Sequence, residues 1–236
     1  MDYLQKTADK LVSERLFAGV EWRVDQSGKN IFAGRSGFQD FATKSEIPEN
    51  AFYRVYSMTK PIISVLALKL IEEGYLQLTS TLAEFDNRFS NMIVLNSDGH
   101  VAPADGLITV EHLLTHRAGF SYDFNIGCAT APYYRQAELM ENGYRDLGDI
   151  ISILSELPLV FNPGSHWRYS VATDVLAYLL ETVTQKTITE LLRNYILNPL
   201  EMTDTNFTIE PENQHRIMQV YGIRSLSELP VLKRLP

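Results

Sequence analysis

The chain has 236 residues, of which 45% are apolar and 21% charged, the composition of an ordinary globular protein. Its formal net charge of −8 argues against a nucleic-acid partner, because phosphate backbones select basic surfaces. No apolar stretch is long enough for a transmembrane helix, and the N-terminus lacks the basic and apolar regions of a signal peptide. We therefore expect a cytoplasmic protein, or a secreted or periplasmic one if a signal peptide has been removed.

The N-terminal part predicts a helix followed by a β-hairpin. Residues 2–17 carry apolar side chains at helical spacing. Residues 20–33 alternate apolar and polar positions on both sides of a turn, which predicts two antiparallel strands. Residues 36–50 have the composition of a loop, and residues 52–56 are expected to be extended.

Residues 57–73 predict a helix with so few polar positions that it should be buried nearly all round. Pro61 has no N–H and suits only a first turn, so this helix should begin very close to Ser57. Lys60 follows Ser57 by three residues and faces the same side. An amine beside a hydroxyl is the minimum equipment of a serine nucleophile that needs no histidine. Desolvation and the helix N-terminus should lower the pKa of Lys60 and favour a neutral amine that acts as a base.

Short helices and loops are expected over the rest of the chain. The helices should lie near residues 110–116, 148–157, 172–185 and 188–197, and Thr109 should cap the first of them. The last thirty residues carry little pattern, and the sequence has no internal repeat.

Tyr169 is a second candidate for chemistry. It follows a turn at 161–164 and precedes the helix expected at 172–185. A tyrosine there can relay a proton if a nearby cation holds its phenol close to ionisation. Taken alone, it is one of twelve tyrosines, and a packing role would be the simpler interpretation.

The remaining candidates indicate structural roles. His112 and His116 have metal-ligand spacing, but Leu113 stands where the H-E-x-x-H pattern needs glutamate, and no third ligand is evident. Cys128 is the only cysteine, so an internal disulfide is excluded, and we expect a small, semi-buried thiol. Nucleotide-binding glycine motifs are absent from the sequence. We expect neither a metal nor a cofactor.

Together these segments resemble the serine β-lactamase and penicillin-binding protein family, specifically its class C, DD-peptidase and esterase branch. The resemblance covers residues 5–210 and rests on several motifs in the family's order: Phe52–Lys60, Ile71–Gly74, Ile108–Phe120, Phe161–Ser170 and Asn198–Thr205. It implies an α+β, β-lactamase/transpeptidase-like fold. Here that fold would consist mainly of the helical region, with an N-terminal β-hairpin of an incomplete antiparallel sheet.

The resemblance also implies one domain over residues 1–236 that is incomplete at its C-terminus. Its parts would be an N-terminal helix and hairpin at 1–56, a helical region with the catalytic motifs at 57–210, and a tail of unclear structure at 211–236. A two-stranded hairpin with an open edge is marginal alone. We therefore expect a symmetry copy, as in a homo-oligomer, or a complementing C-terminal fragment to cover that edge.

The family's catalytic residues map onto Ser57, Lys60 and Tyr169. The resemblance implies that Ser57 is acylated while Lys60 and Tyr169 shuttle its proton, and that water then releases the acyl group. How Lys60 and Tyr169 share the role of base stays open, since coupled groups titrate as a pair.

Two departures from the family pattern affect the expected function. Val171 stands where β-lactamases and peptidases of this branch usually have asparagine, and an aliphatic side chain cannot hydrogen-bond an amide. This favours small carboxylic esters over β-lactams. The third family motif, a strand that supplies a second oxyanion donor, is not recognisable after residue 210. Loss of that donor alone should lower the rate by a factor of order 10².

We therefore expect a serine hydrolase that acts on small carboxylic esters through an acyl-enzyme. One alternative is a β-lactamase or D-alanyl-D-alanine peptidase that uses the same chemistry. Another is an inactive, truncated homologue that binds a ligand or partner. A natural short protein, a cleavage product and an engineered polypeptide are all compatible with the sequence.

Overall fold

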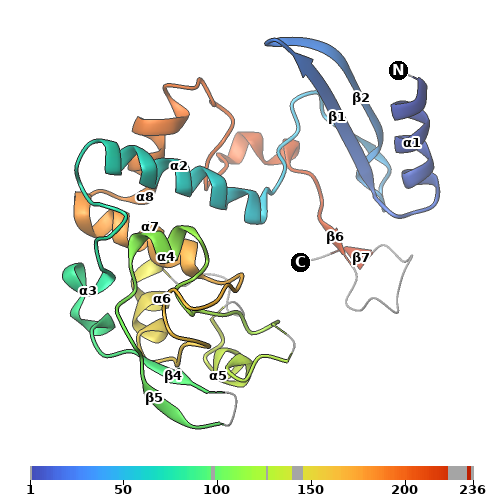
Figure 1. Ribbon diagram of the computed structural model, residues 1–236. Helices are drawn as coiled ribbons and strands as arrows, with labels where there is room; N and C mark the ends of the chain where they lie inside the picture. The colour runs from blue at the N-terminus through green and yellow to red at the C-terminus, as the bar shows by residue number, and fades with distance from the viewer. Residues whose placement is uncertain (1, 97–98, 126, 140–145, 223–232, 235–236) are drawn as a thin grey trace. The chain divides into compact units, whose positions relative to one another are not determined.

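The computed structural model of the chain describes residues 2–96, 99–125, 127–139, 146–222 and 233–234. The chain divides into two compact units, one formed by residues 1–56 with 206–236 and the other by residues 57–205. Figure 1 shows the elements of both units, and each unit is described by itself. The single domain expected over 1–236 stays a prediction.

The first unit is built on a three-stranded antiparallel sheet with the order β1-β2-β3. Its elements are α1 (Asp2–Ser13), β1 (Gly19–Gln26), β2 (Lys29–Asp40) and β3 (Ser45–Glu46). Ser27 and Gly28 both have positive φ, as the tight turn between two twisted strands requires. Helix α1 lies beside β1 and β2 (Figure 1). The predicted helix and hairpin are therefore confirmed.

The loop predicted at residues 36–50 is wrong in part, because β2 continues to Asp40 and β3 pairs with it, while residues 41–44 and 47–50 are turns or irregular. Tertiary contacts hold this extra length of strand. The side-chain amide of Gln39 donates to the carbonyl of Ile217 at 3.0 Å, and the hydroxyl of Tyr221 donates to a carboxylate oxygen of Asp40 at 2.5 Å. Such contacts decide strand formation where local propensity is weak.

The tail at 211–236, whose structure the sequence left unclear, contains short elements of secondary structure. A 3-10 helix, η4 (Pro211–Arg216), leads to Ile217, which forms a parallel bridge with Phe52. Strand β6 (Tyr221–Gly222) then pairs with β7 (Lys233–Arg234). The rest of the tail lies outside the described residues.

The second unit is mainly helical, with one short hairpin (Figure 1). Its elements after the 3-10 turn η1 (Tyr56–Met58) are α2 (Thr59–Glu72), α3 (Leu82–Phe85), η2 (Asn87–Phe89), β4 (Ile93–Leu95), β5 (Val101–Pro103), α4 (Val110–Leu114), α5 (Ala131–Gln136), α6 (Leu147–Leu154), α7 (Ala172–Thr184), α8 (Ile188–Leu192) and the π-helical turn η3 (Arg193–Leu197). The four short helices predicted from the sequence are confirmed as α4, α6, α7 and α8 with η3. Sequence patterning did not predict α3, α5 or the β4–β5 pair.

Helix α7 is the centre of this unit, since it contacts α2, α3, α4, α6 and α8. Four of its large apolar side chains are fully buried: Val175, Leu176, Leu179 and Leu180. Burial of four such side chains contributes several kcal/mol, at about 1.5–3 kcal/mol each. The helix therefore fixes the loop at its N-terminus, residues 166–171, against a rigid core.

Helix α2 differs from its prediction in two ways. It begins at Thr59, and Ser57 lies in the 3-10 turn before it. It is also not buried all round, because Val65 and Leu68 are 52% and 49% exposed while Leu66 and Leu70 are fully buried. The unbroken apolar run concealed a helix with one buried face.

The helices and the small sheets of the two units make this an α+β protein. In the described part of the chain, the helices are all too short or too polar to cross a membrane.

Candidate active site

Ser57 lies in the exposed turn η1, immediately before α2. The preceding residue, Tyr56, has a φ of 43°, which a residue other than glycine rarely adopts. Backbone strain of this kind recurs at functional sites, where the surrounding structure must hold it. Lys60 is the second residue of α2 and is half-buried.

Tyr169 is fixed by the loop before α7. The backbone N–H of Arg168 donates to the carbonyl of His116 at 3.0 Å, and that of Ser170 donates to His116 Nδ1 at 3.3 Å. The side-chain amide of Asn125 donates to the carbonyl of Tyr169 at 3.2 Å. The His116 ring lies against the Tyr169 ring, with centroids 5.0 Å apart. Both the backbone and the ring of Tyr169 are therefore held in place.

Tyr169 and Ser57 meet although 112 residues separate them. The Tyr169 hydroxyl donates to Ser57 Oγ at 2.7 Å, and Lys60 Nζ lies 4.8 Å from the centroid of the Tyr169 ring. The structure thus brings together the three side chains that the sequence singled out. A hydroxyl beside a phenol that a cation faces is a nucleophile with a candidate base.

The pKa values of Lys60 and Tyr169 shift in opposite directions. Partial burial acts to lower the pKa of Lys60, but hydrogen bonds with Tyr169 and Tyr122 outweigh it and raise that pKa. Burial acts to raise the pKa of Tyr169, but hydrogen bonds with Ser57 and Lys60 outweigh it and lower that pKa. The pKa of Lys60 therefore shifts in the direction opposite to the one expected from the sequence, which was a lowered pKa and a neutral amine. The phenol of Tyr169 is the group brought closer to ionisation.

Two residues beside Lys60 escaped the sequence reasoning. Tyr122, in the loop before α5, is 5% exposed, and its ring centroid lies 5.7 Å from Lys60 Nζ. Asp174, in the first turn of α7, acts electrostatically on both Lys60 and Tyr122. Tyr122 lies two residues after the family motif Ile108–Phe120, which does not include it. An acidic residue in a first turn is ordinary for any helix, so only its place five residues after Tyr169 was a signal.

The two histidines of the metal-ligand spacing serve different contacts. His112 closes the capping box of α4, because its Nδ1 accepts from the N–H of Thr109 while its own N–H donates to Thr109 Oγ1, each at 3.2 Å. The cap predicted at Thr109 is thus confirmed. His116 contacts Tyr169 instead. Within the described residues, no three His, Cys, Asp or Glu side chains gather into a possible metal site.

Cys128 and Val171 are both buried, with exposures of 7% and 1%. The Cys128 sulfur lies 3.1 Å from Thr130 Oγ1. Val171 is the N-cap residue of α7, and its aliphatic side chain packs into the core.

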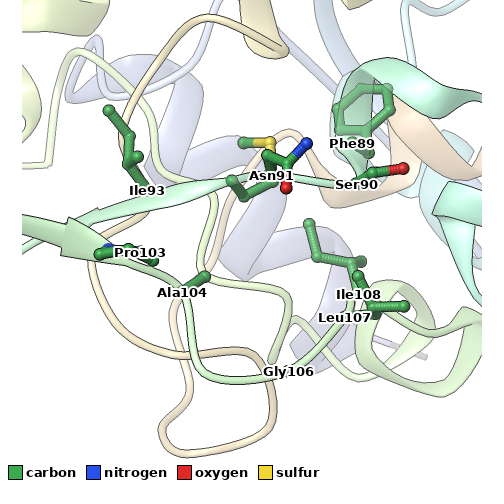
Figure 2. A pocket seen from close by; sticks show the side chains of 10 residues that line it. Phe89, Ser90, Asn91, Ile93, Pro103, Ala104, Gly106, Leu107 and Ile108 are labelled. Atoms are coloured by element: carbon green, nitrogen blue, oxygen red, sulfur yellow. The ribbon is translucent and has the colours of Figure 1, made fainter.

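A separate cavity of about 510 Å³ lies away from these residues. Figure 2 shows its lining, which comes from the end of η2, from β4 and from the segment 103–108. The residues that line it are Phe89, Ser90, Asn91, Met92, Ile93, Pro103, Ala104, Gly106, Leu107 and Ile108. Because none of these side chains titrates near neutral pH, the cavity offers no acid or base for catalysis.

Comparison with known proteins agrees with this fold. A family described as Beta-lactamase matches residues 4–232. The chain is 29% identical over 212 residues to Esterase EstB of Burkholderia gladioli, covering 89% of this chain and 52% of EstB. It is 31% identical over 164 residues to monacolin J acid methylbutanoyltransferase of Aspergillus terreus, covering 66% and 38% of the two chains. A solved structure titled "EstCE1, a hydrolase with promiscuous acyltransferase activity" matches with a TM-score of 0.84 at 25% identity, covering 100% of this chain and 58% of that one.

The fold and the arrangement of the site thus define a protein of the β-lactamase/transpeptidase-like class. More particularly, the chain belongs to the Beta-lactamase family. It spans between 38% and 58% of the length of the relatives just described.

Proposed function

We propose that the chain is a serine hydrolase that acts on small carboxylic esters through an acyl-enzyme, with Ser57, Lys60 and Tyr169 as catalytic residues. The observation that carries this proposal is the 2.7 Å hydrogen bond between Tyr169 and Ser57 Oγ, beside the Lys60 ammonium. The printed names of EstB, an esterase, and EstCE1, a hydrolase, support it.

In the proposed mechanism, Tyr169 is the base and Lys60 stabilises its phenolate. Ser57 Oγ attacks the ester carbonyl carbon while its proton passes to the Tyr169 oxygen. The tetrahedral intermediate collapses, the bond to the alkoxide breaks, and Tyr169 returns the proton to that alcohol. Water then attacks the acyl-enzyme in the same way and releases the acid. General base catalysis of this kind contributes about 10²–10⁴-fold.

Two features favour esters over β-lactams. Val171 is packed in the core, so no side chain at that position can hydrogen-bond an amide. The printed names of EstB, EstCE1 and the methylbutanoyltransferase describe an esterase, a hydrolase and an acyl transferase. An alcohol in the place of water would receive the acyl group, so we expect transesterification as a side reaction.

The test uses a fluorophosphonate probe, a chromogenic short-chain ester and a chromogenic cephalosporin, on the chain and on Ser57→Ala. We expect labelling and ester turnover, both abolished by the substitution, and slow or no cephalosporin turnover. The Ser57→Ala change should lower ester turnover by about 10⁴-fold or more, because the acyl-enzyme cannot form.

The other outcomes of this test identify the alternatives. Faster turnover of the cephalosporin than of the ester would indicate a β-lactamase or D-alanyl-D-alanine peptidase. A chain that folds but is not labelled at Ser57 would be the inactive homologue that binds a ligand or partner.

Further proposals concern partners and location. Strand β1 is an edge of the sheet, and an edge strand offers unpaired backbone groups. We propose that a second copy of the chain or a complementing C-terminal fragment pairs with it. A monodisperse monomer, unchanged in mass when a C-terminal fragment is added, would contradict this.

The cytoplasmic location expected from the sequence also stays a prediction.

A further inference from the structure

Two tyrosines face the same lysine, and the proposed mechanism uses only one of them. Lys60 Nζ lies 4.8 Å from the centroid of the Tyr169 ring and 5.7 Å from that of Tyr122. The two rings are 5.7 Å apart and tilted by 39°. An ammonium stabilises the phenolate of any tyrosine beside it. The geometry therefore needs a feature that decides which phenol exchanges a proton with Ser57.

The surroundings of the two phenols differ. Tyr169 is half-buried and hydrogen-bonds Ser57, whereas Tyr122 is 5% exposed and its ring is stacked on Phe124, with centroids 4.6 Å apart. Asp174, in the first turn of α7, acts electrostatically on Tyr122, and burial raises the pKa of the Asp174 carboxyl itself. Burial and the Asp174 carboxylate together raise the pKa of Tyr122, in spite of Lys60.

From this arrangement we propose that Tyr122 and Asp174 are positioning residues. Tyr122 stays a neutral phenol whose oxygen accepts a hydrogen bond from the Lys60 ammonium, and Asp174 keeps it neutral, so that Tyr169 alone exchanges the proton with Ser57. This inference rests on the proposed function.

The titratable groups that interact with Lys60 in the described part of the chain enter this proposal. They are Tyr122 and Tyr169 on their two loops, Asp174 on α7, and His116 in the loop after α4. Burial and the Lys60 charge lower the pKa of His116, which disfavours a second positive charge beside Tyr169.

The sign of each expected shift follows from these contacts. Turnover needs the Tyr169 phenolate, so the rate rises as pH rises through the pKa of Tyr169. Asp174→Asn removes a carboxylate that raises this pKa, so the rising limb should move to lower pH. Tyr122→Phe removes an acceptor that holds Lys60. The ammonium then stabilises the phenolate less, and the limb should move to higher pH.

The experiment measures kcat and KM for the chromogenic ester against pH, for the chain and for both variants. We expect opposite shifts of about one pH unit and, for Tyr122→Phe, a roughly tenfold lower kcat at neutral pH with little change in KM. Tyr178→Phe is a matched control on α7, because Tyr178 bonds Asp86 and Arg88 instead of this site. The rising limb of the pH–rate profile should lie at the same pH in Tyr178→Phe as in the parent chain.

An ultraviolet titration of the phenolates provides a readout that needs no substrate. Subtraction of the Tyr169→Phe titration isolates Tyr169, whose midpoint should move in the same opposite directions. Absent shifts, or shifts of one sign in both variants, would overturn the inference even if esters are turned over. If the Tyr169 midpoints shift in opposite directions but no ester is turned over, the inference would be supported and the proposed function would be contradicted.

Discussion

The two compact units of the chain differ in the apolar surface that they bury. In the described part of the first unit, the buried apolar side chains are Ala8, Ala18, Ile47 and Met218. The second unit packs its helices around one continuous core, which includes the buried face of α7. Ser57, Lys60 and Tyr169 all belong to the second unit. A catalytic site needs side chains that are held within a fraction of an ångström, and the dense core of the second unit can supply that rigidity.

The largest effect on activity is expected from removal of the Tyr169 hydroxyl, which lies in the densely packed second unit. Tyr169→Phe keeps the ring on His116 but removes the hydroxyl that bonds Ser57. Because the base is lost while the packing stays, kcat for the ester should fall by about 10³-fold. Steady-state kinetics with thermal melting checks this. An active Tyr169→Phe variant with unchanged melting would show that the phenol is not the base.

A pair of core substitutions sharpens the comparison of the two units. Leu70→Ala removes a fully buried side chain of α2 and should lower the free energy of unfolding by about 3 kcal/mol. Ile47→Ala in the first unit should cost less, about 2 kcal/mol, because fewer buried neighbours lose contacts and the surroundings can collapse into the space. Urea unfolding measures both. Equal costs, or a larger cost for Ile47→Ala, would show that the first unit is packed as densely as the second.

A smaller effect is expected at the cap of α4. Thr109→Ala removes the hydroxyl that accepts the N–H of His112, and should destabilise the chain by about 1 kcal/mol. Thr109→Ser is the matched control, since it keeps the hydroxyl. We expect the serine variant to unfold within a few tenths of a kcal/mol of the parent in urea. If both variants lose the same stability, the methyl group rather than the cap would be responsible.

The sequence predicted the helices that carry strong local signals. The cap at Thr109 and the apolar face of α7 are visible in a few consecutive residues, and the structure has them where expected. The end of β2 could not be predicted, because Gln39 and Asp40 are held in the strand by residues more than 170 positions away. Local propensity carries no information about such partners.

The site shows the same limit. Ser57, Lys60 and Tyr169 were found because each stands in a recognisable motif, and the structure places them together. The sequence predicted a lowered pKa for Lys60, whereas the contacts in the structure raise it. Its charge depends on Tyr122, which lies 62 residues further along the chain and has no motif of its own. A pKa is a property of the assembled surroundings, so the helix position of Lys60 was not sufficient to predict it.

The central claim, that an ester acylates Ser57, is tested most directly by mass spectrometry of a rapidly quenched reaction. The chain is mixed with a short-chain ester, quenched in acid and digested with trypsin. Residues 55–69 should form one peptide, because Lys60 precedes Pro61 and is not cleaved. We predict an acyl adduct on Ser57 in this peptide. An adduct on Ser64 instead, or ester turnover with no adduct on the peptide, would contradict the account.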